Sequence, residues 1–275
     1  MSVEITQIQG MRKFLLIPLA LCGLPVTGFG QSVEDLASVT VLPGWRDADG
    51  THVTALRIDL AEGWKTYWRA PGDSGIPPSF AFSGGDITAV QPHFPVPHVY
   101  EDFGIRSIGY EDSVIFPLRL TVPDDGSTVS MAGQIEIGVC DDICIPVTLD
   151  FAALLPPVGA SDPAIVAALR DRPMTEAEAQ VSAVTCRLDP ISDGLQMTAQ
   201  ITMASKAAQE IVVIEVGDPQ VWVSEPSISR TGTTLSAVVD MVHLSGQPFA
   251  LDRSAVRITV LGDGQAVDIR GCAAG

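Results

Sequence analysis

Two cysteines, Cys140 and Cys144, are separated by three residues in the segment 138–146. The two Cα atoms of a disulfide usually lie roughly 4.4–6.8 Å apart, whereas a fully extended chain would place these two about 13 Å apart. The chain between the cysteines must therefore turn back on itself. Because the runs on either side, 134–139 and 145–151, are rich in β-branched residues, we predict that the pair closes an exposed β-hairpin end.

Loop length separates this pair from a second one, Cys186 and Cys272. On the chain-entropy model, a disulfide at the short loop stabilises the fold by only about 2 kcal/mol, whereas the loop between Cys186 and Cys272 gives about 4.6 kcal/mol. We therefore interpret Cys186 and Cys272 as a structural disulfide, and Cys140 and Cys144 as the candidate pair for exchange. A plain structural disulfide and a metal site stay open for the short pair, because its spacing alone is not specific.

The N-terminal region 1–30 is typical of a secretory signal peptide. Met11-Arg-Lys is followed by the apolar run 14–24 and by small residues at 28–30. We expect Met11 to be the true start, and Cys22 to be removed with the signal. Four cysteines then stay in the mature chain, an even number that is typical of oxidising compartments. No later run reaches the roughly 18 apolar residues of a membrane span, so we expect no stable membrane insertion after signal removal.

The net charge is −17 and the isoelectric point is about 4.4. Nucleic acids and anionic membranes are themselves negative, so both are excluded as the main partners. We predict no cofactor and no dedicated metal site.

Short β-rich runs separated by Gly and Asp turns fill the first half of the chain, which is typical of an antiparallel β-sandwich. We expect no helix before Leu155, and we expect the proline-rich region 71–98 to be a long ordered loop. The predicted strands are 38–42, 53–60, 113–122 and 129–139.

A second β-rich block follows a boundary at 154–163. We predict that a short helix begins after this boundary, capped by Ser161 or Asp162 with Pro163 in its first turn. The predicted strands of the second block are 195–203, 211–216, 233–242 and 256–261. The chain is thus predicted to be all-β, with a redox domain at 33–155, a linker with a short helix at 156–180 and a second β-sandwich-like domain at 181–275.

Four motifs, taken in order, connect the first block to a known family. They are Gly63-Trp64 with Tyr67, Glu101-Asp102-Phe103-Gly104, 107–110 with Phe116-Pro117, and Cys140 and Cys144 with Pro146. In this order they resemble the N-terminal periplasmic domain of the thiol:disulfide interchange protein DsbD, over about residues 33–155. The three-residue gap between the cysteines is similar to that of relatives in suppressor-of-copper-sensitivity systems.

The resemblance implies an immunoglobulin-like sandwich in the periplasm. It implies that Cys140 and Cys144 accept electrons from a membrane thiol reductase domain and pass them to periplasmic thiol-disulfide proteins, in processes such as cytochrome c biogenesis or copper tolerance. It further implies that Phe103 is the aromatic residue of a cap loop, that Glu101 and Asp102 are acidic cap residues, and that Tyr67 lies beside the cysteines.

Two other functions stay open. The cysteines could bind Cu(I), which thiolates favour, or the sandwich could be a docking module without chemistry. In the exchange hypothesis, Asp141 and Asp142 should raise the pKa of the neighbouring thiols and make them slow and partner-selective. Since we find neither a membrane domain nor a thioredoxin domain in the sequence, we expect a component of a thiol:disulfide oxidoreductase system.

Overall fold

The computed structural model describes residues 33–72, 75–83, 86–102, 104–123 and 125–275. The predicted signal peptide, including Met11 and Cys22, lies outside the described residues.

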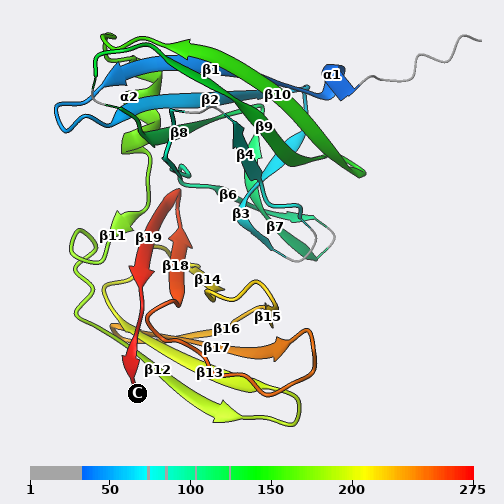
Figure 1. The fold of residues 1–275 in the computed structure, drawn as a ribbon. Helices are drawn as coiled ribbons and strands as arrows, with labels where there is room; N and C mark the ends of the chain where they lie inside the picture. The colour runs from blue at the N-terminus through cyan, green and yellow to red at the C-terminus, as the bar shows by residue number, and fades with distance from the viewer. Residues whose placement is uncertain (1–32, 73–74, 84–85, 103, 124) are drawn as a thin grey trace, which may run out of the picture. The chain divides into compact units, whose positions relative to one another are not determined.

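The first block forms two antiparallel sheets (Figure 1). One sheet has the order β1 (Ala37–Arg46), β2 (His52–Leu60), β8 (Ser113–Thr121) and β5 (Ala89–Pro92). The other has the order β10 (Cys144–Leu155), β9 (Val129–Cys140), β3 (Lys65–Gly72), β7 (Ile105–Glu111) and β6 (His98–Asp102), with β4 (Ser79–Ser83) also paired to β9. These two sheets are the predicted antiparallel β-sandwich.

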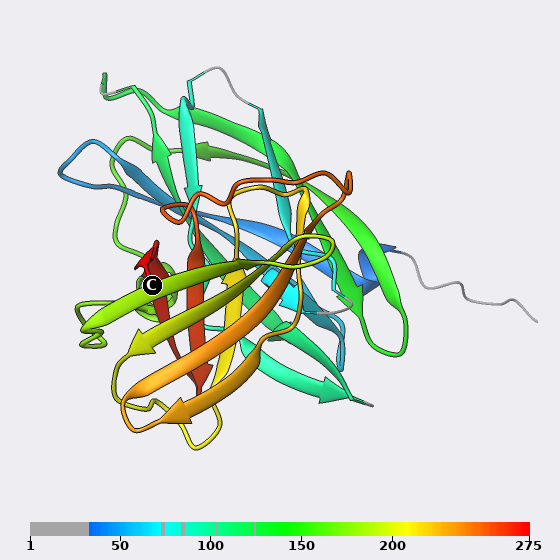
Figure 2. The ribbon, with the colours of Figure 1, turned by 90° about the horizontal axis from the view of Figure 1, so that it is seen from below.

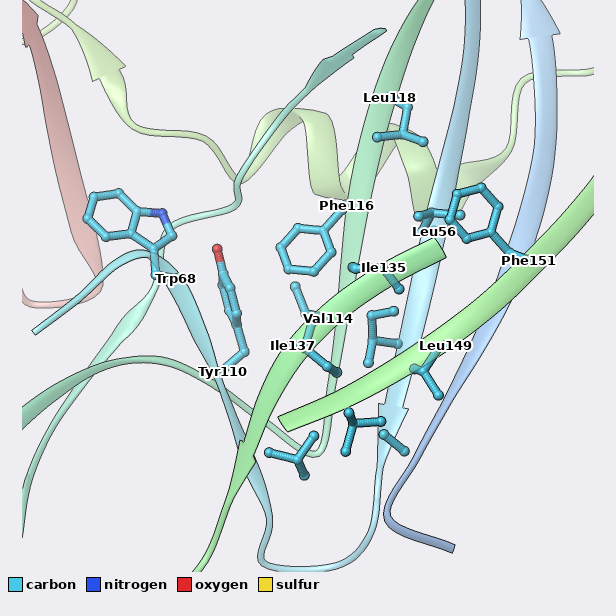
Figure 3. Packing of buried hydrophobic residues seen from close by; sticks show 14 of the residues in the cluster. Leu56, Trp68, Tyr110, Val114, Phe116, Leu118, Ile135, Ile137, Leu149 and Phe151 are labelled. Carbon is cyan, nitrogen blue, oxygen red and sulfur yellow. The ribbon is translucent and has the colours of Figure 1, made fainter. Parts of the chain in front are cut away.

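The core of this sandwich comes from the period-two alternation of its strands. Alternate side chains of β8 in one sheet and β9 in the other point into the shared core, and they include Phe116, Ile135 and Ile137, all fully buried. Trp68 of β3 is also fully buried, and the ring of Tyr110 packs edge-on against Phe116 with a centroid distance of 5.7 Å (Figure 3). Full burial of one such side chain contributes about 1.5–3 kcal/mol.

Two expectations about this block are wrong. The region 71–98 is not one long loop, because it contains strands β4 and β5. Its prolines obscured the alternation Ser79-Phe-Ala-Phe-Ser83, in which the two phenylalanines are the less exposed positions. A four-residue helix, α1 (Val33–Leu36), also precedes β1 where we expected none, and its Leu36 is buried in the core.

Helix α2 (Pro163–Arg170) begins where the sequence predicted it. Of the two candidate caps, the structure selects Asp162, whose carboxylate accepts a hydrogen bond of 2.8 Å from the backbone N–H of Ala164. Ile165 of this helix is fully buried in a small cluster with Val53 and Ala55 of β2. None of the helices within the described residues is long and apolar enough to cross a bilayer.

The second block also forms two sheets, drawn from yellow-green to red in Figure 2. One has the order β11 (Met174–Thr175), β19 (Gln265–Arg270), β18 (Arg257–Gly262) and β14 (Ile211–Glu215). The other has the order β15 (Val221–Val223), β17 (Thr234–His243), β13 (Leu195–Thr202), β12 (Ala183–Pro190) and β20 (Ala273–Ala274), with β16 (Ser227–Thr231) also paired to β17. The predicted fold class, an immunoglobulin-like sandwich followed by a second sandwich, is confirmed.

A disulfide joins Cys186 of β12 to Cys272, with a Cα–Cα distance of 5.7 Å. It connects the first long strand of the second block to the segment just before β20. The domain bounds 33–155, 156–180 and 181–275 stay predictions.

Candidate functional site: a disulfide at the end of a hairpin

Cys140 and Cys144 form a disulfide at the end of the β9–β10 hairpin. The two residues are directly opposite each other in the ladder, the first of twelve pairs that run from this end to Leu155 and Val129. Their Cα atoms lie 4.2 Å apart. The turn that the spacing demands is therefore the hairpin turn itself.

The two cysteines differ sharply in exposure. Cys140 is only 5 % exposed, whereas Cys144 is an exposed residue. The order of the sheet explains this difference, because β9 is flanked on one side by β10 and on the other by β3, where Cys140 pairs with Lys65. Strand β10 is the edge of the sheet. Of the two cysteines, Cys144 is therefore the one with the larger exposed surface.

The hydroxyl of Tyr67 contacts both sulfurs. It donates a hydrogen bond of 2.9 Å to Cys140 Sγ, and its oxygen lies 3.1 Å from Cys144 Sγ. The Tyr67 side chain reaches them across β9 at Gly138, where an added Cβ would lie 3.1 Å from the ring. The Thr66 hydroxyl fixes the neighbouring backbone by donating a bond of 2.9 Å to the Gly138 carbonyl. The structure places Tyr67, which the family resemblance predicted beside the cysteines, with its hydroxyl next to both sulfurs, and its role there stays a prediction.

Burial raises the pKa of Tyr67 above its usual value of 10.0. The hydroxyl therefore keeps its proton at neutral pH and acts as a donor. Hydrogen bonding to a thiolate stabilises the charged form, so Tyr67 should lower the pKa of a cysteine thiol once the disulfide is reduced.

Three exposed residues form the turn between the cysteines. Asp141 and Asp142 bring negative charge next to the sulfurs, and Ile143 has 65 % of its surface exposed. The carboxylates oppose the effect of Tyr67 on a thiolate, but solvent and salt screen exposed charges, whereas the Tyr67 hydroxyl is in direct contact with the sulfurs. Ile143 was not predicted as a site residue. The one sequence feature that indicates it is the presence of an apolar residue inside a tight turn.

Two of the predicted cap residues, Glu101 and Asp102, are the last residues of β6. Glu101 is exposed and its carboxylate forms an ion pair of 3.1 Å with Arg106 Nη2. Phe103 lies outside the described residues, and Asp102 is placed only as the last residue of β6. The assignment of a cap therefore stays a prediction.

Lys65 is a further residue at the site that the sequence reading did not select. It pairs with Cys140 on one side and with Glu111 on the other, and its ammonium lies 4.4 Å from the ring centroid of Tyr100. The sequence feature that could have indicated Lys65 is its position two residues before Tyr67, because this spacing in a strand puts both side chains on one face. Within the described part of the chain, no group of three or more His, Cys, Asp or Glu side chains could hold a metal ion.

Residues 38–156 match the family model described as the N-terminal part of the thiol:disulfide interchange protein DsbD. The first block is therefore similar to this N-terminal domain over the matched residues. The predicted resemblance over about residues 33–155 is thereby confirmed.

The fold similarity extends beyond this DsbD-like sandwich. The crystal structure of the N-terminal periplasmic domain of ScsB from Proteus mirabilis superposes with a TM-score of 0.66 at 24 % sequence identity. The match covers 88 % of this chain and 95 % of the ScsB domain. At this identity the likeness shows the fold alone, and it includes the second sandwich. No curated protein matches the sequence.

Proposed function

We propose that this protein is a periplasmic thiol:disulfide exchange module that relays electrons through Cys140 and Cys144. The observation that carries the proposal is the hydroxyl of Tyr67, buried and aimed at both sulfurs of a disulfide that has one exposed cysteine. A purely structural hairpin disulfide would need neither the donor nor an exposed cysteine. The match of residues 38–156 to the DsbD N-terminal family model supports the same function.

The partners in this proposal are a membrane-bound thiol reductase, which donates electrons, and periplasmic thiol-disulfide proteins, which receive them. In the first step a thiolate of the reductase attacks Cys144 Sγ, because Cys144 is the exposed cysteine and Cys140 is buried. The bond between Cys140 and Cys144 breaks, and its electron pair stays on Cys140 as a thiolate. The second thiolate of the reductase then attacks the reductase sulfur of this mixed disulfide, and Cys144 is released as a thiolate.

Electrons leave by the reverse order of events. The Cys144 thiolate attacks an oxidised recipient, and one recipient sulfur departs as a thiolate. The Cys140 thiolate then attacks Cys144 Sγ, which restores the original disulfide and releases the reduced recipient. Tyr67 contacts both sulfurs, so its hydroxyl can donate to whichever one carries the negative charge.

Trapping of mixed disulfides tests this function. In the full chain, Cys140→Ser leaves the exposed Cys144 thiol without its resolving partner, so it should accumulate covalent complexes with a reductase or a recipient. Cys144→Ser leaves only the buried Cys140 and serves as the matched variant, which should trap far less. The expected products are covalent complexes that survive alkylation of free thiols and are cleaved by a dithiol. Mass mapping identifies the cysteines that they join.

Graded reduction of the wild-type protein separates exchange from the other candidate functions. Mild dithiol should free Cys140 and Cys144 while Cys186 and Cys272 stay bridged. Equal resistance of both disulfides would contradict the proposal and favour two structural disulfides. Tight Cu(I) binding by the reduced protein without any mixed disulfide would favour a copper-binding function.

A further inference from the structure

Strand β3 loses its regular ladder just after the tyrosine that contacts the sulfurs. It pairs with β9 at Lys65 and Thr66, and with β7 as far as Tyr67. The register with β7 then shifts, and pairing resumes at Gly72. The segment 68–71 therefore lies outside the regular ladder and must be held in place by its side chains.

Two side chains hold this irregular segment. Trp68 is fully buried in the first sandwich (Figure 3), and the guanidinium of Arg69 stacks over its ring at 3.7 Å from the centroid. Arg69 is 11 % exposed, and its Nε atom donates to the Glu215 carboxylate at 3.1 and 3.2 Å. Arg69 Nη2 donates to the Thr259 hydroxyl at 2.9 Å. Glu215 belongs to β14 and Thr259 to β18, both in the second sandwich.

Glu215 is the principal counterion of Arg69. A second carboxylate, Asp268 of β19, lies 3.7 Å from Arg69 Nη2, but it is already bonded by Arg257 and by Arg270. A buried charge that loses its partner is strongly destabilised, so this contact imposes a definite position on the Arg69 backbone.

We propose that Arg69 is a positioning residue through which the second sandwich holds Tyr67 against the sulfurs of Cys140 and Cys144. Arg69 follows Tyr67 by two residues on the same strand, at the point where the ladder of β3 stops fixing the chain. The second sandwich is then a part of the exchange site, although its side chains do not react. This inference deepens the proposed function and rests on it for its biological meaning.

The test uses the full chain and the variant Glu215→Gln, which keeps the shape of the side chain and removes its charge. The matched control is Glu210→Gln, since Glu210 is a buried carboxylate of the same sandwich that bonds Arg230 and the backbone of Lys206 instead. Two quantities are measured: the pH at which the reduced Cys140 and Cys144 thiols titrate, and their equilibrium with the disulfide in glutathione buffers.

If Tyr67 moves away from the sulfurs, the reduced form loses a hydrogen-bond donor. We expect Glu215→Gln to shift the thiol titration to higher pH by about 0.5–1 unit and the glutathione equilibrium toward the disulfide by about 3- to 10-fold. Glu210→Gln should lower the melting temperature without either shift. A melting-temperature loss in Glu215→Gln with unchanged titration and equilibrium would overturn the inference.

A second pair of variants keeps the inference testable if Glu215→Gln folds poorly. Arg69→Met should give the same shifts in the wild-type background and none in a Tyr67→Phe background, because Arg69 acts through the Tyr67 hydroxyl. Equal shifts in both backgrounds would overturn it. The thiol titration needs only chemically reduced protein, so it tests Arg69 even if trapping with partners fails and the proposed function falls.

Discussion

A single hydroxyl group contacts both sulfurs of the disulfide, and it comes from a tyrosine that is itself 5 % exposed. Burial raises the pKa of Tyr67, so the group is a neutral donor throughout the pH range in which thiols titrate. Its contribution is local and resists salt, unlike that of the exposed Asp141 and Asp142. Tyr67 is therefore the residue whose loss should change the sulfur chemistry most directly.

Tyr67→Phe removes this donor and keeps the ring. A hydrogen bond of this kind contributes about 0.5–1.5 kcal/mol, so the thiols should titrate up to about one pH unit higher. Alkylation rates of the reduced protein across pH measure the change. The control is Tyr110→Phe, because the Tyr110 hydroxyl is also buried but donates to the Pro95 carbonyl at 2.9 Å. An identical alkylation profile in wild type and Tyr67→Phe would contradict this role.

His52 gives the fold a predictable response to acid. It is fully buried, its Nε2 lies 2.7 Å from the Pro43 carbonyl oxygen, and burial lowers its pKa below the usual 6.5. Below pH 6.5 the unfolded chain therefore binds more protons at this residue than the folded protein does. The free energy of unfolding should accordingly fall as the pH drops from 6.5 toward the lower folded-state pKa.

Urea unfolding at pH 7.5 and 5.5 tests the contribution of His52. His52→Gln should lower stability at both values but lose less between them than the wild type does. A loss of the same size in both proteins would show that other groups carry the acid response, among them His93, whose pKa burial also lowers.

At the scale of elements, the β9–β10 hairpin and its neighbour β3 define the site. The sequence predicted the hairpin, because the cysteine spacing demands a turn and β-branched runs flank it. It could not predict that Cys140 is buried and Cys144 exposed, since this depends on β3 covering one side of β9. Sheet order is a tertiary property, and no local pattern in 134–151 encodes it.

Other elements also divide into those that local sequence predicts and those that depend on tertiary structure. Asp162 and Pro163 mark the start of α2 by local chemistry, and that prediction is confirmed in position. Strands β4 and β5 were missed because the many prolines of the region 71–98 outweighed a short alternation. The partners of Arg69 could not be predicted from the sequence, because Glu215 lies 146 residues further along the chain. The role of Tyr67 was predicted only through the family resemblance.

The hairpin turn carries its own prediction. Asp141→Asn with Asp142→Asn removes two negative charges beside the sulfurs, so the reduced thiols should ionise more readily. We expect roughly 2- to 5-fold faster alkylation at pH 7 in low salt, and a smaller gain in high salt, because the carboxylates are exposed. Asp193→Asn, in the turn between β12 and β13, is the control and should leave the rate unchanged. A slower reaction in the double variant would mean that the aspartates assist exchange.

At the scale of the whole molecule, the two disulfides serve different needs. Cys186 is fully buried and its bond to Cys272 spans 86 residues, whereas the bond between Cys140 and Cys144 spans four. Constraint of the unfolded chain grows with loop length, so the long-range disulfide contributes most of the stability that cross-linking provides.

The double variant Cys186→Ser with Cys272→Ser should therefore lose about 2–5 kcal/mol of unfolding free energy and still exchange thiols at the hairpin. Thermal melts and a glutathione-exchange assay measure the two properties separately. Cys140→Ser with Cys144→Ser is the converse variant, which should lose only about 2 kcal/mol of stability but lose exchange completely. A folded Cys186 and Cys272 double variant without exchange would show that we have assigned the two disulfides the wrong way round.

The ladder between β9 and β10 sets how much the protein must rearrange when it changes oxidation state. The cysteine pair is only the first of twelve opposed pairs, so we expect backbone hydrogen bonds to keep the rest of the hairpin paired after the sulfurs separate. Oxidised and reduced molecules should then share one backbone, and a partner would meet the same shape before and after transfer. The disulfide and dithiol forms of such a carrier would differ only at two sulfur atoms. Release of the partner after transfer would then depend on the chemistry of these sulfurs rather than on a conformational change.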